Sequence, residues 1–141
     1  MITKEKAIKI LAGISIGLIV VGGGMAYKGY KDSHDPQQVE INIHKASKDI
    51  RAYTDSIEED EDDISILQGY REDLDEYIIQ VWTEEPYYKI AADPYYKELQ
   101  TSINNFATTK LKENNLRWVK MNVIVFDNDY NIVYGEDVPP K

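Results

Sequence analysis

The pattern of apolar and polar residues divides the chain into an apolar N-terminal segment and a longer amphipathic part. Residues 10–27 form a run of eighteen positions without a charge, with lysines close on both sides. At about 1.5 Å per residue, a helix of this length measures about 27 Å, close to the ~30 Å hydrocarbon core of a bilayer. The pattern predicts a single transmembrane helix that contacts the lipid bilayer through residues 10–27, within an anchor and linker at residues 1–35.

A cleaved signal peptide is the alternative interpretation of this segment. Basic residues before a short apolar core, and the small residues Gly24 and Ala26, are typical of such a signal. The extension of the run to Tyr27 favours a retained helix in the cell membrane. The excess of lysines before the run favours an orientation that makes the C-terminal part extracytoplasmic. Small residues at four-residue spacing permit close packing of two membrane helices. These candidate membrane helix packing positions are Gly13, Gly17, Gly22 and Ala26.

Apolar spacing predicts long helices across residues 37–82. With Ile43 as position a of a heptad, eleven of the thirteen a and d positions from Val39 to Val81 are apolar, and no proline interrupts the segment. This pattern is typical of one coiled-coil rod, or of two amphipathic helices folded as an antiparallel hairpin.

Six consecutive acidic residues at positions 58–63 interrupt this helical pattern. Like charges four residues apart repel each other, and acidic side chains oppose the dipole at the C-terminal end of a helix. We therefore expect a break near residues 59–63, which separates a helical stalk (36–62) from a small acidic helical domain (63–141). The run offers carboxylates to a divalent cation, but on one helix they point apart, so a solvated surface is the stronger interpretation.

An internal repeat follows, in which residues 85–89 read EPYYK and residues 93–97 read DPYYK. An acidic residue before a proline suits the start of a helix, so the repeat predicts helices over 86–92 and 94–115. Neighbouring positions of a helix point about 100° apart, so one tyrosine of each pair should be exposed, Tyr95 rather than Tyr96 in the second pair. The longer helix has an apolar face formed by Tyr96, Leu99, Ile103, Phe106, Ala107 and Leu111.

The C-terminal residues predict a β-hairpin. Residues 118–126 and 130–134 are rich in β-branched and aromatic residues, and Asp127-Asn128-Asp129 between them is typical of a turn. The acids also match the start of an EF-hand loop, but Ile132 stands where that loop needs glycine. Taken together, the predicted fold class is mainly α with a small C-terminal β-hairpin (α+β), with an N-terminal single transmembrane helix followed by long coiled-coil-like helices.

Charge and composition narrow the candidate chemistry. The chain has a net charge of −9, and residues 36–141 combine 22 acidic with 11 basic side chains. Such a domain repels phosphate, so we expect no nucleic-acid partner. The G-x-S-x-G sequence at residues 13–17 lies inside the apolar segment, no cysteine is present, and the two histidines do not form a ligand set. The sequence therefore predicts no enzyme, and no catalytic, cofactor-binding or metal-binding residues.

These features predict a non-enzymatic single-pass membrane protein that presents an acidic helical domain for protein–protein interaction at a bacterial or phage-modified cell envelope. Alternatives are a small-ligand or divalent-cation sensor, and a secreted binding factor released by signal-peptide cleavage. The expected partner is another protein, or a second copy of the chain in a weak homodimer. Its candidate surface consists of Tyr87, Tyr95, Glu58, Glu59, Asp60 and Glu61.

Overall fold

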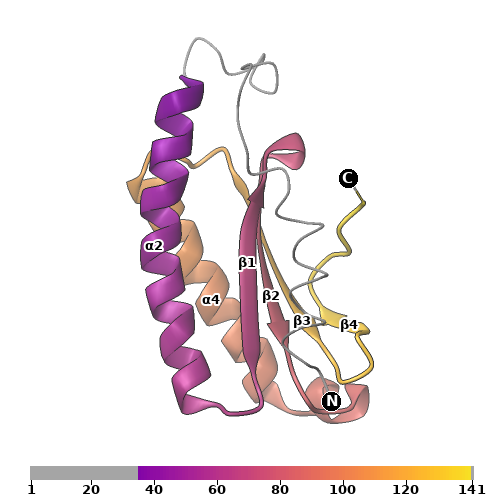
Figure 1. Cartoon of the computed structure of the whole chain (residues 1–141). Helices are drawn as coiled ribbons and strands as arrows, with labels where there is room; N and C mark the ends of the chain where they lie inside the picture. Colours follow the sequence, from indigo (N-terminus) through magenta and orange to yellow (C-terminus); the bar gives the residue numbers. More distant parts are fainter. Residues whose placement is uncertain (1–34, 141) are drawn as a thin grey trace.

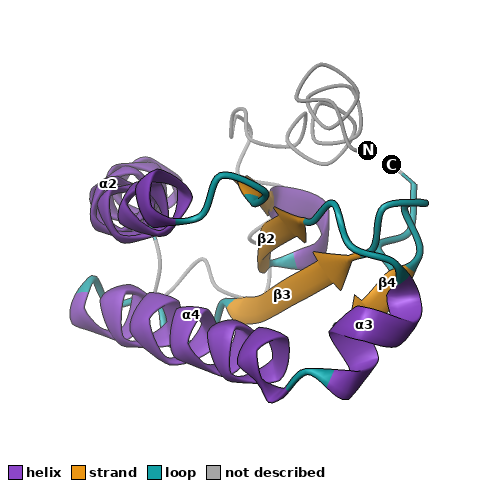
Figure 2. Ribbon diagram, turned by 90° about the horizontal axis from the view of Figure 1, so that it is seen from below, coloured by secondary structure: helices purple, strands orange, loops and turns teal. Residues whose placement is uncertain are grey.

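Two long helices lie on one face of a four-stranded mixed sheet in the computed structural model, which describes residues 35–140 (Figures 1 and 2). The sheet order is β1-β2-β3-β4, with β2 and β3 parallel and both outer pairs antiparallel. In chain order the elements are α2 (Pro36–Asp60), β1 (Ser65–Arg71), a 3-10 turn η3 (Glu72–Leu74), β2 (Glu76–Trp82), α3 (Tyr87–Ala92), α4 (Pro94–Glu113), β3 (Lys120–Phe126) and β4 (Ile132–Tyr134).

Helix α2 follows from local signals in the sequence. The Asp35 side chain accepts a hydrogen bond from the Gln37 amide (3.0 Å), and a proline occupies the first turn. The helix ends at Asp60, inside the acidic run, so the predicted break near residues 59–63 is confirmed. Its buried face uses the expected heptad positions Val39, Ile43, Ala46 and Ile50.

The predicted continuation of long helices through residue 82 is wrong. Residues 65–82 form an antiparallel hairpin, β1–β2, in which Gln68 lies opposite Ile79. Side chains on both faces of β2 are buried, as expected for a central strand rich in β-branched and aromatic residues. An apolar run of this kind also satisfies heptad spacing, which is why the pattern suggested a helix. The fold is α+β with a mixed sheet, and it contains no long coiled-coil pair within residues 35–140.

The core between the helices and the sheet joins α2 to the rest of the described chain. The rings of Tyr53 on α2 and Phe106 on α4 stack with centroids 4.3 Å apart. The Gln68 amide donates to the Thr54 hydroxyl (2.9 Å), and the Tyr77 hydroxyl donates to the Gln68 side-chain carbonyl. These buried polar groups are therefore satisfied across the junction of α2, β1 and β2.

The opposite face of the sheet carries a second apolar cluster formed by Ile78, Trp82, Ile124 and Phe126. Trp82 stacks on Phe126 with ring centroids 3.9 Å apart. The C-terminal residues run across this face, because the Asn122 side chain bonds the backbone of Glu136 and the Arg71 guanidinium donates to the Pro139 carbonyl (2.8 Å). The tail therefore reaches from β3 to β1.

The predicted C-terminal strands and turn are confirmed, although they belong to the larger sheet. Strand β3 pairs with β4 on one side and with β2 on the other. The buried Asp127 carboxylate accepts hydrogen bonds from the Asp129 and Asn131 amides, both at 2.8 Å. These bonds make Asp127 a turn residue.

No helix within residues 35–140 is long and apolar enough to cross a bilayer. The predicted span, residues 10–27, lies outside the described residues, as do its packing positions Gly13, Gly17, Gly22 and Ala26. The prediction of a single-pass protein located in the cell membrane is accordingly corrected. The function proposed below for residues 35–140 does not depend on a membrane anchor.

Candidate functional site

The second half of the EPYYK/DPYYK repeat forms the junction between α3 and α4. Helix α3 has its C-cap at Asp93, and the same residue is the N-cap of α4. Its carboxylate accepts a hydrogen bond from the Tyr95 amide through Oδ1 (3.0 Å), and Pro94 follows in the first turn. The predicted helices at 86–92 and 94–115 are thus confirmed to within two residues, and Asp93 joins them directly.

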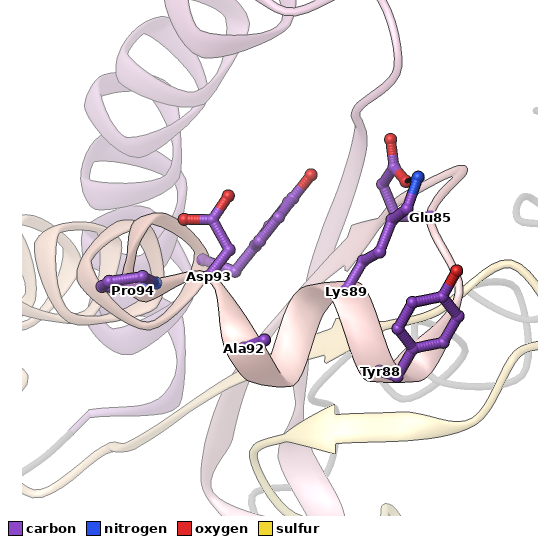
Figure 3. Close-up of a pocket in the computed structure, with 7 residues that line it drawn as sticks. Glu85, Tyr88, Lys89, Ala92, Asp93 and Pro94 are labelled. Carbon is purple, nitrogen blue, oxygen red and sulfur yellow. Dashed lines mark ion pairs between the residues drawn. The ribbon is translucent and has the colours of Figure 1, made fainter.

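An open pocket of about 540 Å³ lies at this junction. In Figure 3 the side chains of Glu85, Tyr88, Lys89 and Asp93 point to the same side of α3. The pocket therefore combines acidic groups, one lysine and aromatic rings. Its lining residues are Glu85, Tyr88, Lys89, Ala92, Asp93, Pro94 and Tyr96.

Tyr95 and Tyr96 differ in exposure as expected. Tyr95 is 37% exposed, whereas Tyr96 is 8% exposed and packs in the core with Leu99 and Ile103. The Tyr95 hydroxyl donates to Glu61 Oε1 at 3.0 Å, which links the start of α4 to the end of α2. Partial burial, and next the contact with Glu61, raise the pKa of Tyr95 to about 12.

Tyr96 also lines the pocket. Its ring meets Tyr95 edge-to-face, with centroids 5.2 Å apart, and within residues 35–140 its hydroxyl has no hydrogen-bond partner. Burial raises the pKa of Tyr96 to about 12, and nearby carboxylates add to the shift; in order of effect they are Asp63, Glu85, Asp93 and Glu61. The neutral phenol of Tyr96 is therefore close to several negatively charged carboxylates.

Glu85 is positioned by the loop before α3. Its carbonyl accepts a hydrogen bond from the Asn128 amide (2.9 Å), and its carboxylate Oε2 lies 3.7 Å from Lys89 Nζ one turn along α3. The loop is held in turn by Thr83, which donates to the Phe126 carbonyl (2.9 Å) at the end of β3. The acidic side of the pocket is therefore built on the ends of β2 and β3.

The first tyrosine pair does not follow the expected alternation. Tyr87 is 50% exposed and Tyr88 is 70% exposed, so the expectation that one of them is buried is wrong. Helix α3 has only six residues, and Ile90 alone is buried. A helix this short covers too little of the core to bury a second large side chain.

The structure joins two of the residues predicted for the partner surface, Tyr95 and Glu61, through one hydrogen bond. Glu59 and Asp60 are exposed and Glu58 is half-buried at the end of α2, while Tyr87 lies on α3. None of these six predicted residues lines the pocket.

Sequence reasoning did not single out Glu85, Lys89, Asp93 or Tyr96 as site residues, although all four line the pocket. The repeat was the available signal, because it places an acid and a proline before each of two successive helices. Three or more carboxylates or imidazoles that could together hold a metal ion do not occur within residues 35–140.

Comparison of the chain with protein-family models, with curated proteins and with solved structures found no match. The site geometry is therefore the basis of the functional argument.

Proposed function

We propose that residues 35–140 form a non-enzymatic binding module whose end formed by α3 and the start of α4 binds a basic segment of a protein partner. The observation that carries this proposal is the position of the exposed aromatic residues. Four large apolar or aromatic side chains are exposed within residues 35–140, and three of them, Tyr87, Tyr88 and Tyr95, belong to the repeat.

Exposed tyrosines suit a protein interface. Tyrosine presents a large, rigid surface with a polar end and is enriched among the residues that dominate binding energy. Here Tyr88, the most exposed of them, lines the pocket together with Glu85 and Asp93. Aromatic contact area and negative charge therefore lie side by side.

Charge supports a basic partner. Residues 35–140 carry 23 acidic and 10 basic side chains, a net charge of −13. Complementary charge increases the rate of encounter and disfavours partners of the same sign. A second copy of the chain is a poorer partner for this end, since the two acidic surfaces would repel each other.

Selection from a displayed library of random peptides tests the proposal, with the full chain immobilised. We expect enrichment of peptides that combine lysine or arginine with apolar residues, and weaker binding as salt rises. A Tyr87→Ser, Tyr88→Ser double variant should weaken the selected peptides at least ten-fold. The matched control is Ile41→Ser, which removes the fourth exposed apolar side chain (48% exposed), on α2.

Unchanged binding by the tyrosine variant, or an equal loss in the Ile41→Ser control, would overturn the proposal. Enrichment of acidic or neutral peptides would also contradict it. Thermal melting of each variant checks that the fold is retained, as expected for substitutions at exposed positions.

A further inference from the structure

Residues 136–140, which we call the strap, belong to no helix or strand and are held on the sheet by two side chains. Asn122 on β3 donates through Nδ2 to the Glu136 carbonyl (2.9 Å) and accepts a hydrogen bond from the Glu136 amide through Oδ1 (3.1 Å). Near the other end of the strap, Arg71 on β1 donates to the Pro139 carbonyl (2.8 Å). Both of these side chains are buried, so the sheet fixes the two points of attachment.

The strap buries little of its own surface. Val138 is half-buried and packs against the apolar cluster on this face of the sheet, whereas the other four residues of the strap are exposed. Each of its three hydrogen bonds contributes about 1 kcal/mol. A segment with so few contacts opens at a lower free energy than the core, so the strap can open while the sheet stays folded.

Glu76 is an acidic residue of the sheet that lies on the same face as the strap. Alternate residues of a strand share a face, and Glu76 begins β2 two residues before Ile78 of the apolar cluster. It is paired in register with Arg71 on β1 and with Lys120 on β3. Two basic residues therefore flank Glu76 within the sheet, and the strap adds a third neighbour, Glu136, whose charge has the opposite effect.

The strap and the sheet act differently on the proton of Glu76. Burial raises the pKa of Glu76 and the charge of Glu136 raises it further, whereas Lys120 and Arg71 lower it. The two basic residues belong to β3 and β1, so they stay beside Glu76 when the strap opens; Asp73 is bonded to Arg71 and reduces the effect of its charge. The repulsion by Glu136, in contrast, is lost on opening. The closed form therefore holds this proton more tightly.

We propose that the strap is a pH-dependent cover of this sheet face, which closes firmly when Glu76 is protonated and loosens when Glu76 is charged. Because the closed form binds the proton more tightly, closure is strongest below the ordinary pKa of a glutamate and weakens as pH rises through the raised pKa of Glu76. The strap lies on the side of the sheet away from α2 and α4 (Figure 1), so this inference is independent of the proposed function.

Hydrogen exchange of the Glu136 amide, which is bonded to Asn122, tests the proposal in the ¹⁵N-labelled full chain. Its protection factor, corrected for the intrinsic exchange rate at each pH, is followed from pH 4 to pH 7. We expect a decrease of about three-fold or more, since a difference of one pKa unit between two forms changes their ratio about ten-fold. The amide of Ile79, in the buried strand β2, should keep its protection, and an equal decrease there would overturn the proposal.

Two variants identify the charges that act on the strap. Glu76→Gln keeps the size of the side chain and cannot titrate, so the Glu136 amide should have the same protection at pH 4 and pH 7. Glu136→Gln removes the repulsion and should raise this protection at pH 7. Asp137→Asn is the matched control, because Asp137 is the next acid of the strap and is not among the charges of residues 35–140 that shift the pKa of Glu76.

The control should show the same decrease as the original chain. Constant protection of Glu136 in the original chain, or an unchanged decrease in Glu76→Gln, would overturn the proposal. Loss of the decrease in Asp137→Asn would show a general effect of charge and would also overturn it. Asn122→Ala removes both bonds to Glu136 and should abolish the protection of this amide at every pH while Ile79 stays protected. Retained protection would mean that Asn122 does not hold the strap, which contradicts the proposed cover.

Discussion

Tyr95 and Tyr96 show how two adjacent identical residues acquire different roles at the start of one helix. Adjacent positions in α4 point about 100° apart, so Tyr96 enters the core while Tyr95 reaches across to Glu61, the C-cap of α2. Both phenols have a pKa of about 12, with burial as the largest cause in each case. Folding therefore favours the neutral, protonated form of both phenols.

The raised pKa values predict a loss of stability in alkali. Tyrosine in the unfolded chain ionises near pH 10, whereas Tyr95 and Tyr96 keep their protons to about pH 12 when folded. Between these values the folded state binds more protons, so the free energy of unfolding decreases as pH rises. A Tyr95→Phe, Tyr96→Phe double variant should show a smaller decrease in urea denaturation between pH 9 and 11. The prediction fails if its slope equals that of the original chain, or if Tyr87→Phe flattens the slope equally.

Within residues 35–140, Gly135 is a position at which the backbone conformation restricts the sequence directly. It has a φ of +97°, and a Cβ at this position would approach the Val123 carbonyl oxygen to 2.5 Å. Gly135→Ala should therefore destabilise the fold by about 1–3 kcal/mol, measured by urea denaturation. A stability equal to that of the original chain would show that the tail after β4 adapts freely.

At the scale of elements, Asp93 connects two helices because it ends α3 and caps α4. Asp93→Ala removes the side-chain bond to the Tyr95 amide and should lower stability by about 1 kcal/mol. Asp93→Asn keeps that bond and should be nearly neutral for stability. Thermal melting of both variants separates the cap from the charge, and an equal loss in the two variants would mean that the negative charge stabilises the junction.

The network of Tyr77, Gln68 and Thr54 fixes α2 to the β1–β2 hairpin. Tyr77→Phe removes the donor to the Gln68 carbonyl and leaves that buried oxygen without its phenol partner. The expected cost is about 1–3 kcal/mol in urea denaturation. Tyr87→Phe, at an exposed position, is the control. A neutral Tyr77→Phe variant would show that Gln68 finds another donor.

On the scale of the whole molecule, elements with local signals were predictable from the sequence. Asp93 with Pro94 identified the start of α4, and Asp127-Asn128-Asp129 identified the last turn. Each signal acts over a few neighbouring residues, so the sequence pattern contains it.

The sheet was not predictable in the same way. The residues of β2 satisfy heptad spacing as well as a buried strand, and the parallel pairing of Ile79 with Val123 joins distant parts of the chain. The site was predicted only in part for the same reason, because it also depends on contacts between residues that are far apart in the sequence. The tyrosines could be expected to form contacts, but the bond from Tyr95 to Glu61 depends on the packing of α2 beside α4.

Chemical-shift mapping of a selected basic peptide on the ¹⁵N-labelled full chain tests the central claim most directly. If the end formed by α3 and the start of α4 is the binding surface, the largest amide shifts should lie in residues 85–97 and 61–63. These shifts should decrease in the Tyr87→Ser, Tyr88→Ser variant at equal peptide concentration. Largest shifts on the N-terminal half of α2, or on the sheet face that carries Ile78 and Ile124, would contradict the account.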